Sequence, residues 1–304
     1  MKSKPTVLYD VPGPRARRRN VLWTLLFLLG IAAVVWWVVA SLADKNQLEW
    51  SKWAPFFTDA RVWETYILPA LRNTVIAAAL AMVIALPLGA LLGISRLSEH
   101  RAVRGAAGTV VEFFRAIPVL ILMLFADAAY SEFFDVSPDV RPLYAVVTGL
   151  VLYNASVLAE VVRAGILALP AGQTDAAKAI GMRKGQTMTY VLLPQSVTAM
   201  LPALVSQLVV IVKDTALGGA MLGFSELLAS VRPMSANYGA NTIACFTVVA
   251  VLFVILNFAL TTFASWLEGR LRRGKKSTGA VVGADAVEEL ATPGEHAGPT
   301  DETK

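Results

Sequence analysis

Long apolar stretches alternate with shorter polar ones along this chain. Six apolar stretches, at about residues 21–43, 68–94, 110–130, 143–162, 198–222 and 241–267, approach the roughly 20 residues that a helix needs to cross a bilayer. None shows the period-two alternation of a membrane β-strand. The pattern therefore predicts an all-α integral membrane protein with six transmembrane helices.

Composition agrees with this prediction. The chain is 56% hydrophobic and 16% charged, whereas soluble domains carry about 25% charged residues. The net charge of +5 comes from basic residues beside the apolar stretches, which favours a role in membrane topology over nucleic-acid binding. The single cysteine, Cys245, and two distant histidines, His100 and His296, exclude a disulfide framework and give no metal site.

The distribution of basic residues predicts the orientation. With Arg163 set aside as a helix-end residue, segments 1–20, 95–109, 163–197 and 268–304 carry 18 of the Lys and Arg residues, against 5 in segments 44–67, 131–142 and 223–240. Cytoplasmic loops are enriched in Lys and Arg. We therefore expect a multi-pass protein of the plasma membrane with both termini in the cytoplasm. The first apolar stretch is too long for a signal peptide. The next segment contains Trp50, Trp53 and Trp63, which suit the membrane interface. The composition of residues 277–304 indicates a disordered tail.

The long predicted cytoplasmic loop at 163–197 is patterned. It reads Asp175-Ala176-Ala177, three residues, Gly181, nine residues, then Val191-Leu192-Leu193-Pro194. A short helix is expected, because Thr174 is a good N-cap, Asp175 would lie in the first turn, and alanines favour helices. Gly181 would end this helix, and Pro194 would let the chain turn into the fifth span.

This spacing resembles the EAA motif of bacterial ABC importer permeases, which is Glu-Ala-Ala, three residues, Gly, nine residues, Ile-x-Leu-Pro. Asp175 and Val191 are conservative departures. The resemblance implies that a coupling helix containing Asp175, Ala176, Ala177, Gly181 and Pro194 docks on an ATPase. The basic stretch 269–276 fails the Walker A pattern, because Lys276 stands where Ser or Thr is required. We therefore expect a permease, not an enzyme, with ATP bound by a partner ATPase and no cofactor on this chain.

Ionisable residues inside predicted spans are candidates for function, because they are costly there. Lys213, Asp214 and Thr215 lie near the middle of the fifth span. Lys213 and Asp214 either neutralise each other or bind the carboxylate and amine of a zwitterion. Glu160 and Arg163, one turn apart in the fourth span, either pair or face an inner vestibule. At the start of the third span, Glu112 and Arg115 have the spacing of an ion pair.

Further motifs narrow the resemblance to polar amino acid ABC permeases, the histidine/glutamine/glutamate group. They are Glu112-Phe-Phe-Arg-Ala-Ile-Pro118, Ala159-Glu-Val-Val-Arg-Ala-Gly165, Leu193-Pro-Gln195 and Lys213-Asp-Thr215. The resemblance implies a five-helix permease domain over 68–267, preceded by an extra helix at 21–43. It also implies an amino acid pathway at Lys213 and Asp214.

The N-terminal segment 6–14 and the extra helix resemble one permease subunit of actinobacterial glutamate importers, which makes glutamate the expected substrate. The resemblance implies two ATP-binding subunits, a second permease expected to be a different homologous chain, and an extracytoplasmic amino acid binding protein. The lipid bilayer is the remaining partner, and no nucleic acid is expected.

Two other classes of protein fit less well. An ion-coupled secondary carrier would need repeated halves with paired broken helices, and the sequence shows no clear halves. An integral membrane enzyme would need a catalytic constellation, and no Ser/His/Asp, HExxH or paired-carboxylate pattern is present.

Overall fold

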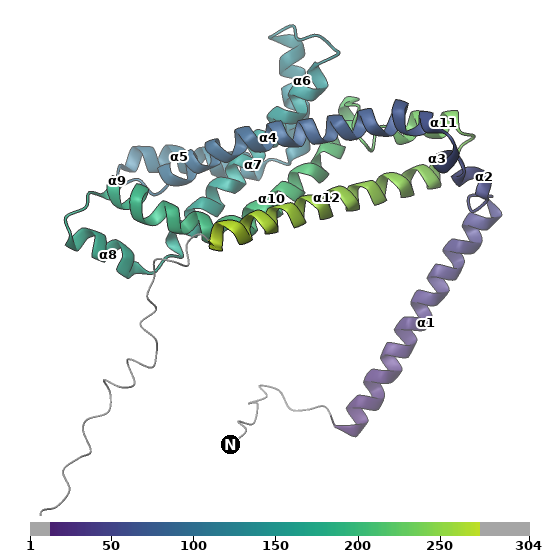
Figure 1. The fold of residues 1–304 in the computed structure, drawn as a ribbon, viewed down its shortest axis with the longest axis horizontal. Helices are drawn as coiled ribbons and strands as arrows, with labels where there is room; N and C mark the ends of the chain where they lie inside the picture. The colour runs from purple at the N-terminus through teal and green to yellow at the C-terminus, as the bar shows by residue number, and fades with distance from the viewer. Residues whose placement is uncertain (1–12, 274–304) are drawn as a thin grey trace, which may run out of the picture.

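The computed structural model describes residues 13–273 and is built from helices throughout that range (Figure 1). Residues 1–12 of the expected cytoplasmic N-terminus and residues 274–304 of the expected disordered tail lie outside the described residues. The elements are α1 (Pro14–Asp44), α2 (Trp50–Trp53), α3 (Pro55–Thr58), η1 (Val62–Ile67), α4 (Leu68–Ser95), α5 (Arg101–Ala116), α6 (Val119–Glu132), α7 (Arg141–Leu167), α8 (Ala171–Ala179), α9 (Lys184–Gln186), η2 (Thr187–Leu192), α10 (Leu193–Leu222), α11 (Val231–Asn237) and α12 (Thr242–Arg273).

The expected all-α membrane fold is confirmed, with one correction in the third span. Five helical segments are long and apolar enough to cross a membrane, or six if α5 and α6 count as one bent span. The stretch 110–130 is not one helix, because α5 and α6 meet at 99°. The break falls at Ile117 and Pro118, which both have extended backbone. Proline disfavours the helical conformation of the residue before it, which explains the position of the bend.

Small residues allow α4 and α7 to pack closely. Ala81, Ala85, Gly89 and Gly93 recur every fourth residue along α4 and are all buried. A Cβ atom on Gly89 would lie 2.6 Å from the Cβ of Leu158 on α7, and one on Gly93 would lie 2.5 Å from a backbone oxygen of α7. Such small-residue stripes let transmembrane helices approach each other closely. The α4–α7 pair therefore forms the centre of the bundle.

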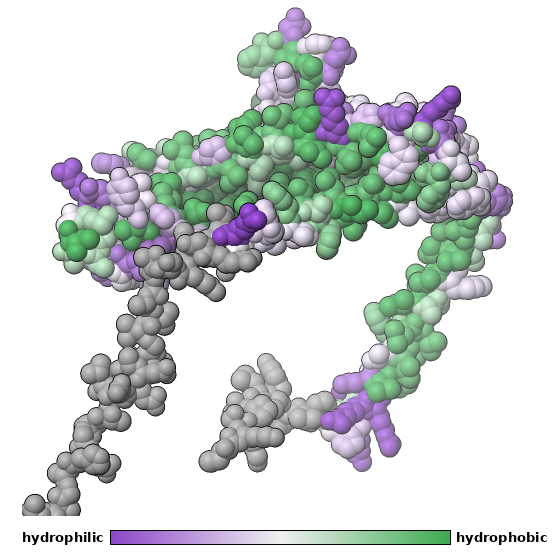
Figure 2. All heavy atoms as spheres, in the orientation of Figure 1, coloured by the Kyte–Doolittle hydropathy of each residue, from purple (hydrophilic) through white to green (hydrophobic). Residues whose placement is uncertain are grey.

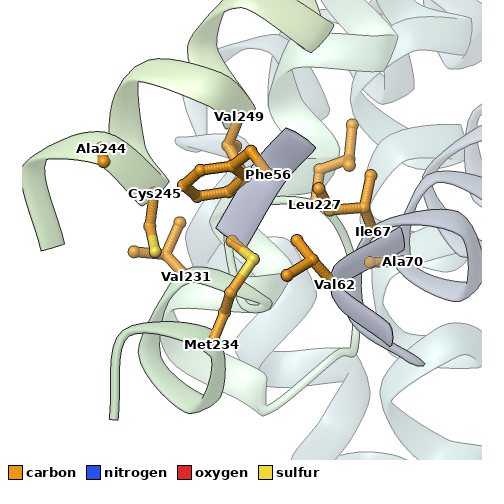
Figure 3. Close-up of a cluster of buried hydrophobic side chains, with 10 residues drawn as sticks. All are labelled: Phe56, Val62, Ile67, Ala70, Leu227, Val231, Met234, Ala244, Cys245 and Val249. Atoms are coloured by element: carbon orange, nitrogen blue, oxygen red, sulfur yellow. The ribbon is translucent and has the colours of Figure 1, made fainter. Parts of the chain in front are cut away.

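A second core closes one end of the bundle. Phe56 of α3 and Val62 of η1 pack against Leu227, Val231 and Met234, and the cluster extends to Ala70 of α4 and to Ala244, Cys245 and Val249 of α12 (Figure 3). The segment between α1 and α4 is therefore a packed cap and not a simple polar linker. Cys245 is fully buried in it.

The tryptophans of this cap do not all behave as an interfacial belt. Trp50 is 67% exposed, as expected for the membrane interface. Trp53 and Trp63 are half-buried, and their Nε1–H groups donate to the carbonyls of Gln47 at 3.1 Å and Phe56 at 2.9 Å. These two side chains therefore hold the cap together.

Helix α1 stands apart from the bundle. It begins at Pro14 and ends at Asp44, so it is longer than the expected 21–43, and none of its residues is buried. Figure 1 shows it leaning away from the other helices. Its surface is apolar along most of its length and polar at the arginine-bearing end (Figure 2). Only lipid or a partner chain can cover such a helix in a membrane.

Polar residues gather at the two ends of the bundle and at the tip of α6, which projects from its middle, and much of the remaining visible surface is apolar (Figure 2). Helices α8 and α9 lie at one end, and α2, α3 and α11 lie at the other (Figure 1). The expected cytoplasmic elements α8 and α9 thus lie opposite the expected outer elements α2, α3 and α11, whereas the loop 131–142 follows α6 and lies apart from both groups.

Candidate coupling loop and translocation site

The patterned loop is shorter than the sequence predicts. Helix α7 continues to Leu167, and helical structure resumes at Lys184 and runs through η2 into α10. The helical segment that contains the fifth apolar stretch is therefore Lys184–Leu222, which begins before residue 198. Pro194 lies within this continuous helical segment, where η2 passes into α10. The chain thus reverses between α8 and α9, and the expected turn at Pro194 is wrong.

Helix α8 begins four residues earlier than expected. Its N-cap is Pro170, so Thr174 lies inside the helix and is not its cap. Asp175 consequently lies mid-helix instead of in the first turn, where the helix dipole would favour it. Proline fixes its own φ and cannot donate a backbone hydrogen bond, so Pro170 suits the residue just before the first turn.

Gly181 ends α8 as predicted. Its φ is +80°, a left-handed conformation that glycine adopts without steric penalty. The amide of Gly181 donates to the carbonyl of Lys178 at 2.9 Å, and the amide of Met182 donates to that of Ala177 at 3.0 Å. This pair of hydrogen bonds is the Schellman motif, which satisfies carbonyls at a helix C-terminus.

One face of α8 is attached to the bundle and the other is free. Ala177 is 3% exposed against the η2 segment, and Gln195 donates to Gln173 at 3.2 Å. Asp175 and Ala176 are exposed, and Asp175 forms no ion pair within the part of the chain that the structure describes. The small free face of α8 can therefore approach another protein closely.

Two large apolar side chains beside α8 are also exposed. Ile180 is 78% exposed and Tyr190 is 73% exposed. Ile180 follows α8 directly, and Tyr190 belongs to η2, which contacts α8. Exposed apolar side chains on two contacting elements can form part of an interaction surface.

A network of ion pairs joins α4, α5 and α7 near the same end. Glu160 accepts hydrogen bonds from Arg163 on its own helix and from Arg96, at 2.8 Å, just after α4. Arg96 also lies 2.9 Å from Glu112, whereas Arg115 is 3.9 Å from Glu112 and 4.0 Å from Glu160. The two pairs expected from the sequence are thus parts of one network.

Arg96 is the central member of this network, and the sequence analysis missed it. It is the least exposed of the five side chains, at 16%. Helical spacing in a sequence identifies only pairs about one turn apart, whereas Arg96 and Glu160 are 64 residues apart. The position of Arg96 immediately after a transmembrane helix is the feature of the sequence that could have identified it.

Lys213, Asp214 and Thr215 point in different directions from α10. Lys213 is exposed, Asp214 is half-buried, and Thr215 is fully buried with its hydroxyl donating to the carbonyl of Val212 at 2.7 Å. Lys213 and Asp214 form no ion pair within 4.0 Å, because adjacent helix positions diverge by about 100°. Lys213 faces α12 and lines two cavities there, of about 260 and 420 Å³.

The chain is similar to known transport proteins over most of its length. It is 45% identical over 234 residues to the glutamate transport system permease protein GluD of Corynebacterium glutamicum, covering 77% of this chain and 85% of that protein. It is 27% identical over 277 residues to the arginine transport system permease protein ArgU of the same organism, covering 87% of this chain and 85% of that protein.

A solved structure supports the fold. The chain matches a structure described as an amino acid ABC transporter with histidines, with a TM-score of 0.63 and 23% identity over 72% of this chain and 98% of that chain. The named relatives are permease proteins, in which ATP hydrolysis belongs to a separate subunit, and this favours a permease over the secondary carrier. The model of a family described as binding-protein-dependent transport system inner membrane components matches residues 85–273. This chain therefore belongs to the inner membrane components of binding-protein-dependent transport systems.

Proposed function

We propose that this chain forms part of the amino acid pathway of an ATP-driven importer in the plasma membrane, and that its substrate is glutamate or a related polar amino acid. The 45% identity to a glutamate permease carries this proposal. The arginine permease is less similar, at 27% identity. Both termini lie in the cytoplasm in this proposal, which follows the distribution of Lys and Arg.

The coupling helix in this proposal is α8. Asp175 and Ala176 form its free face, Ala177 attaches it to the η2 segment, and Gly181 fixes its end. Pro194 starts α10, through which a movement of α8 would reach the membrane. Two ATPase subunits would bind ATP, one against this chain and one against a second, homologous permease. An extracytoplasmic binding protein would meet the cap around α2, α3 and α11.

The pathway would follow the exposed face of α10. An ammonium in hydrocarbon costs about 2.5–3.5 kcal/mol on insertion scales, so Lys213 is better placed toward a water-filled path shared with the second permease. There it would attract the substrate carboxylate, and Asp214 would attract the amine. Thr215, the next residue, would stabilise α10 at this position. Arg163, one-third exposed beside Glu160, would mark the inner end.

The decisive experiment is uptake by the assembled complex in proteoliposomes. Radiolabelled glutamate, aspartate, glutamine and arginine would be supplied with the binding protein and ATP. We expect glutamate to be preferred, and a catalytically inactive ATPase to abolish uptake. Uptake that persists with the inactive ATPase would instead identify a secondary carrier.

The pathway is tested in the same assay by Lys213→Met. We expect at least about a tenfold loss of uptake, as for a lost charged hydrogen bond, while the ATPase stays bound. Lys45→Met, an exposed lysine just beyond α1, is the matched control and should change nothing. Normal uptake by Lys213→Met would contradict the pathway proposal.

A further inference from the structure

Two cavities follow the groove between α10 and α12, and Lys213 and Phe253 line both. The cavity of about 260 Å³ also contacts Leu228 and Phe246. The cavity of about 420 Å³ also contacts Val209, Val254, Asn257, Phe258 and Thr261. Lower numbers on α10 accompany higher numbers on α12, because the two helices run antiparallel (Figure 1). Lys213 therefore lies at the boundary between the cavities, and Asn257 lies in the cavity nearer the α8 end.

The ammonium group of Lys213 has no hydrogen-bond acceptor among the described residues. Within residues 13–273 it forms neither a hydrogen bond nor an ion pair within 4.0 Å. Side chains on a helix lean toward its N-terminus, and the N-terminus of α10 lies at the α8 end. The lysine chain is thereby biased toward the cavity that contains Asn257.

The side-chain oxygen of Asn257 lacks a hydrogen-bond donor among the described residues. Its Nδ2 donates to the carbonyl of Phe253 at 2.7 Å, which ties the amide to its own helix. Its Oδ1 is buried and has no hydrogen-bond partner among the described residues. A buried acceptor left unpaired is destabilising, and its presence in a folded protein requires an explanation.

We propose that Asn257 is a positioning residue for Lys213. A small rearrangement of the α10–α12 groove brings the Lys213 Nζ onto the Asn257 Oδ1, and this hydrogen bond holds the ammonium at the boundary between the cavities. A carboxylate that arrives from the other cavity then replaces the amide as the acceptor. This inference rests on the proposed pathway, because it assigns Asn257 a role only through Lys213.

The test is a double-mutant cycle in the reconstituted complex. Asn257→Leu has a similar size but no acceptor, and Asn257→Gln keeps the amide. We expect Asn257→Leu to reduce glutamate uptake about tenfold, as for one hydrogen bond to a charged group, and Asn257→Gln to retain most of it. Thr262→Val, five positions along α12 and outside the set that lines the larger cavity, is the matched control.

The combined variant separates positioning from packing. If Asn257 acts through Lys213, then Lys213→Met with Asn257→Leu should transport no worse than Lys213→Met alone, whereas independent effects would multiply. Full activity of Asn257→Leu, or multiplied losses, would overturn the inference while leaving the pathway intact. Normal uptake by Lys213→Met alone would refute both.

A second measurement does not depend on transport. With Cys245 replaced by alanine, cysteines at positions 213 and 257 should be joined by a short bifunctional reagent, whereas cysteines at 213 and 262 should not. Absence of the first cross-link in a folded, ATPase-binding complex would also overturn the inference.

Discussion

Replacing Gly181 with alanine tests whether the shape of α8, and not merely its sequence, binds the ATPase. Gly181 has a φ of +80°, and no atom lies within 4 Å of the position that a Cβ would take. The alanine methyl group would therefore clash with nothing, and only backbone strain would change. Left-handed backbone costs an L-residue roughly 1–2 kcal/mol.

That strain acts on a helix with little stability of its own. Helix α8 has nine residues, and isolated helices of this length are marginal in water. If docking requires the formed helix, a loss of about 1–2 kcal/mol weakens ATPase binding by a factor of about 5–30. Asparagine tolerates left-handed backbone better than alanine, so Gly181→Asn should fall between wild type and Gly181→Ala.

The assay measures dissociation of a labelled ATPase subunit from the permease complex in nanodiscs, together with ATP-driven uptake. Gly185→Ala is the matched control, because Gly185 belongs to the same loop, has ordinary φ and also has free space around its Cβ position. Equal ATPase affinity for Gly181→Ala and Gly185→Ala would refute the argument that the glycine cap preforms the docking helix.

Three further predictions concern the bundle. Gly93→Ala should destabilise the complex by about 1–3 kcal/mol, because its Cβ would lie 2.5 Å from a backbone oxygen of α7; Gly105→Ala, which has open space, should leave thermal stability unchanged. Arg96→Ala should lower the melting temperature more than Arg115→Ala, because its ion pairs are 2.8–2.9 Å instead of 3.9–4.0 Å; equal effects would refute the central place of Arg96. Burial raises the pKa of the Glu226 carboxyl, while two backbone amides partly oppose the shift. A raised pKa means that the stabilising contribution is complete below the ordinary glutamate pKa and is lost as pH rises through the folded-state value. Glu226→Gln should therefore flatten the pH dependence of thermal stability above roughly pH 4.5, and an unchanged slope would contradict this.

The membrane-spanning helices could be predicted because apolar length alone identifies them. The bend between α5 and α6 could not be located in this way, since hydropathy does not register the backbone constraint of Pro118. The same constraint at Pro170 moved the start of α8 and changed the position of Asp175. In both cases the sequence contains the proline, but the pattern of residues around it predicts a different helix boundary.

The missed parts of the candidate site depend on contacts between distant residues. Arg96 joins Glu160 across 64 positions, and nothing in the local sequence pairs them. Ionisable residues in a span are conspicuous because of their cost in lipid, whereas the neutral amide of Asn257 gives no such signal. Its significance comes from sharing a cavity with Lys213, and such proximity between two helices requires the fold.

The separation of α1 from the bundle has a consequence for how the protein is made and how it has diverged. This helix precedes the packed helices along the chain, so it can enter the bilayer on its own hydrophobicity before they are made. Because it buries no side chain against the rest of the described chain, its loss would open no hole in the bundle. The solved amino acid transporter matches over 98% of its own chain but over only 72% of this one. The packed bundle therefore does not depend on α1 for its own core.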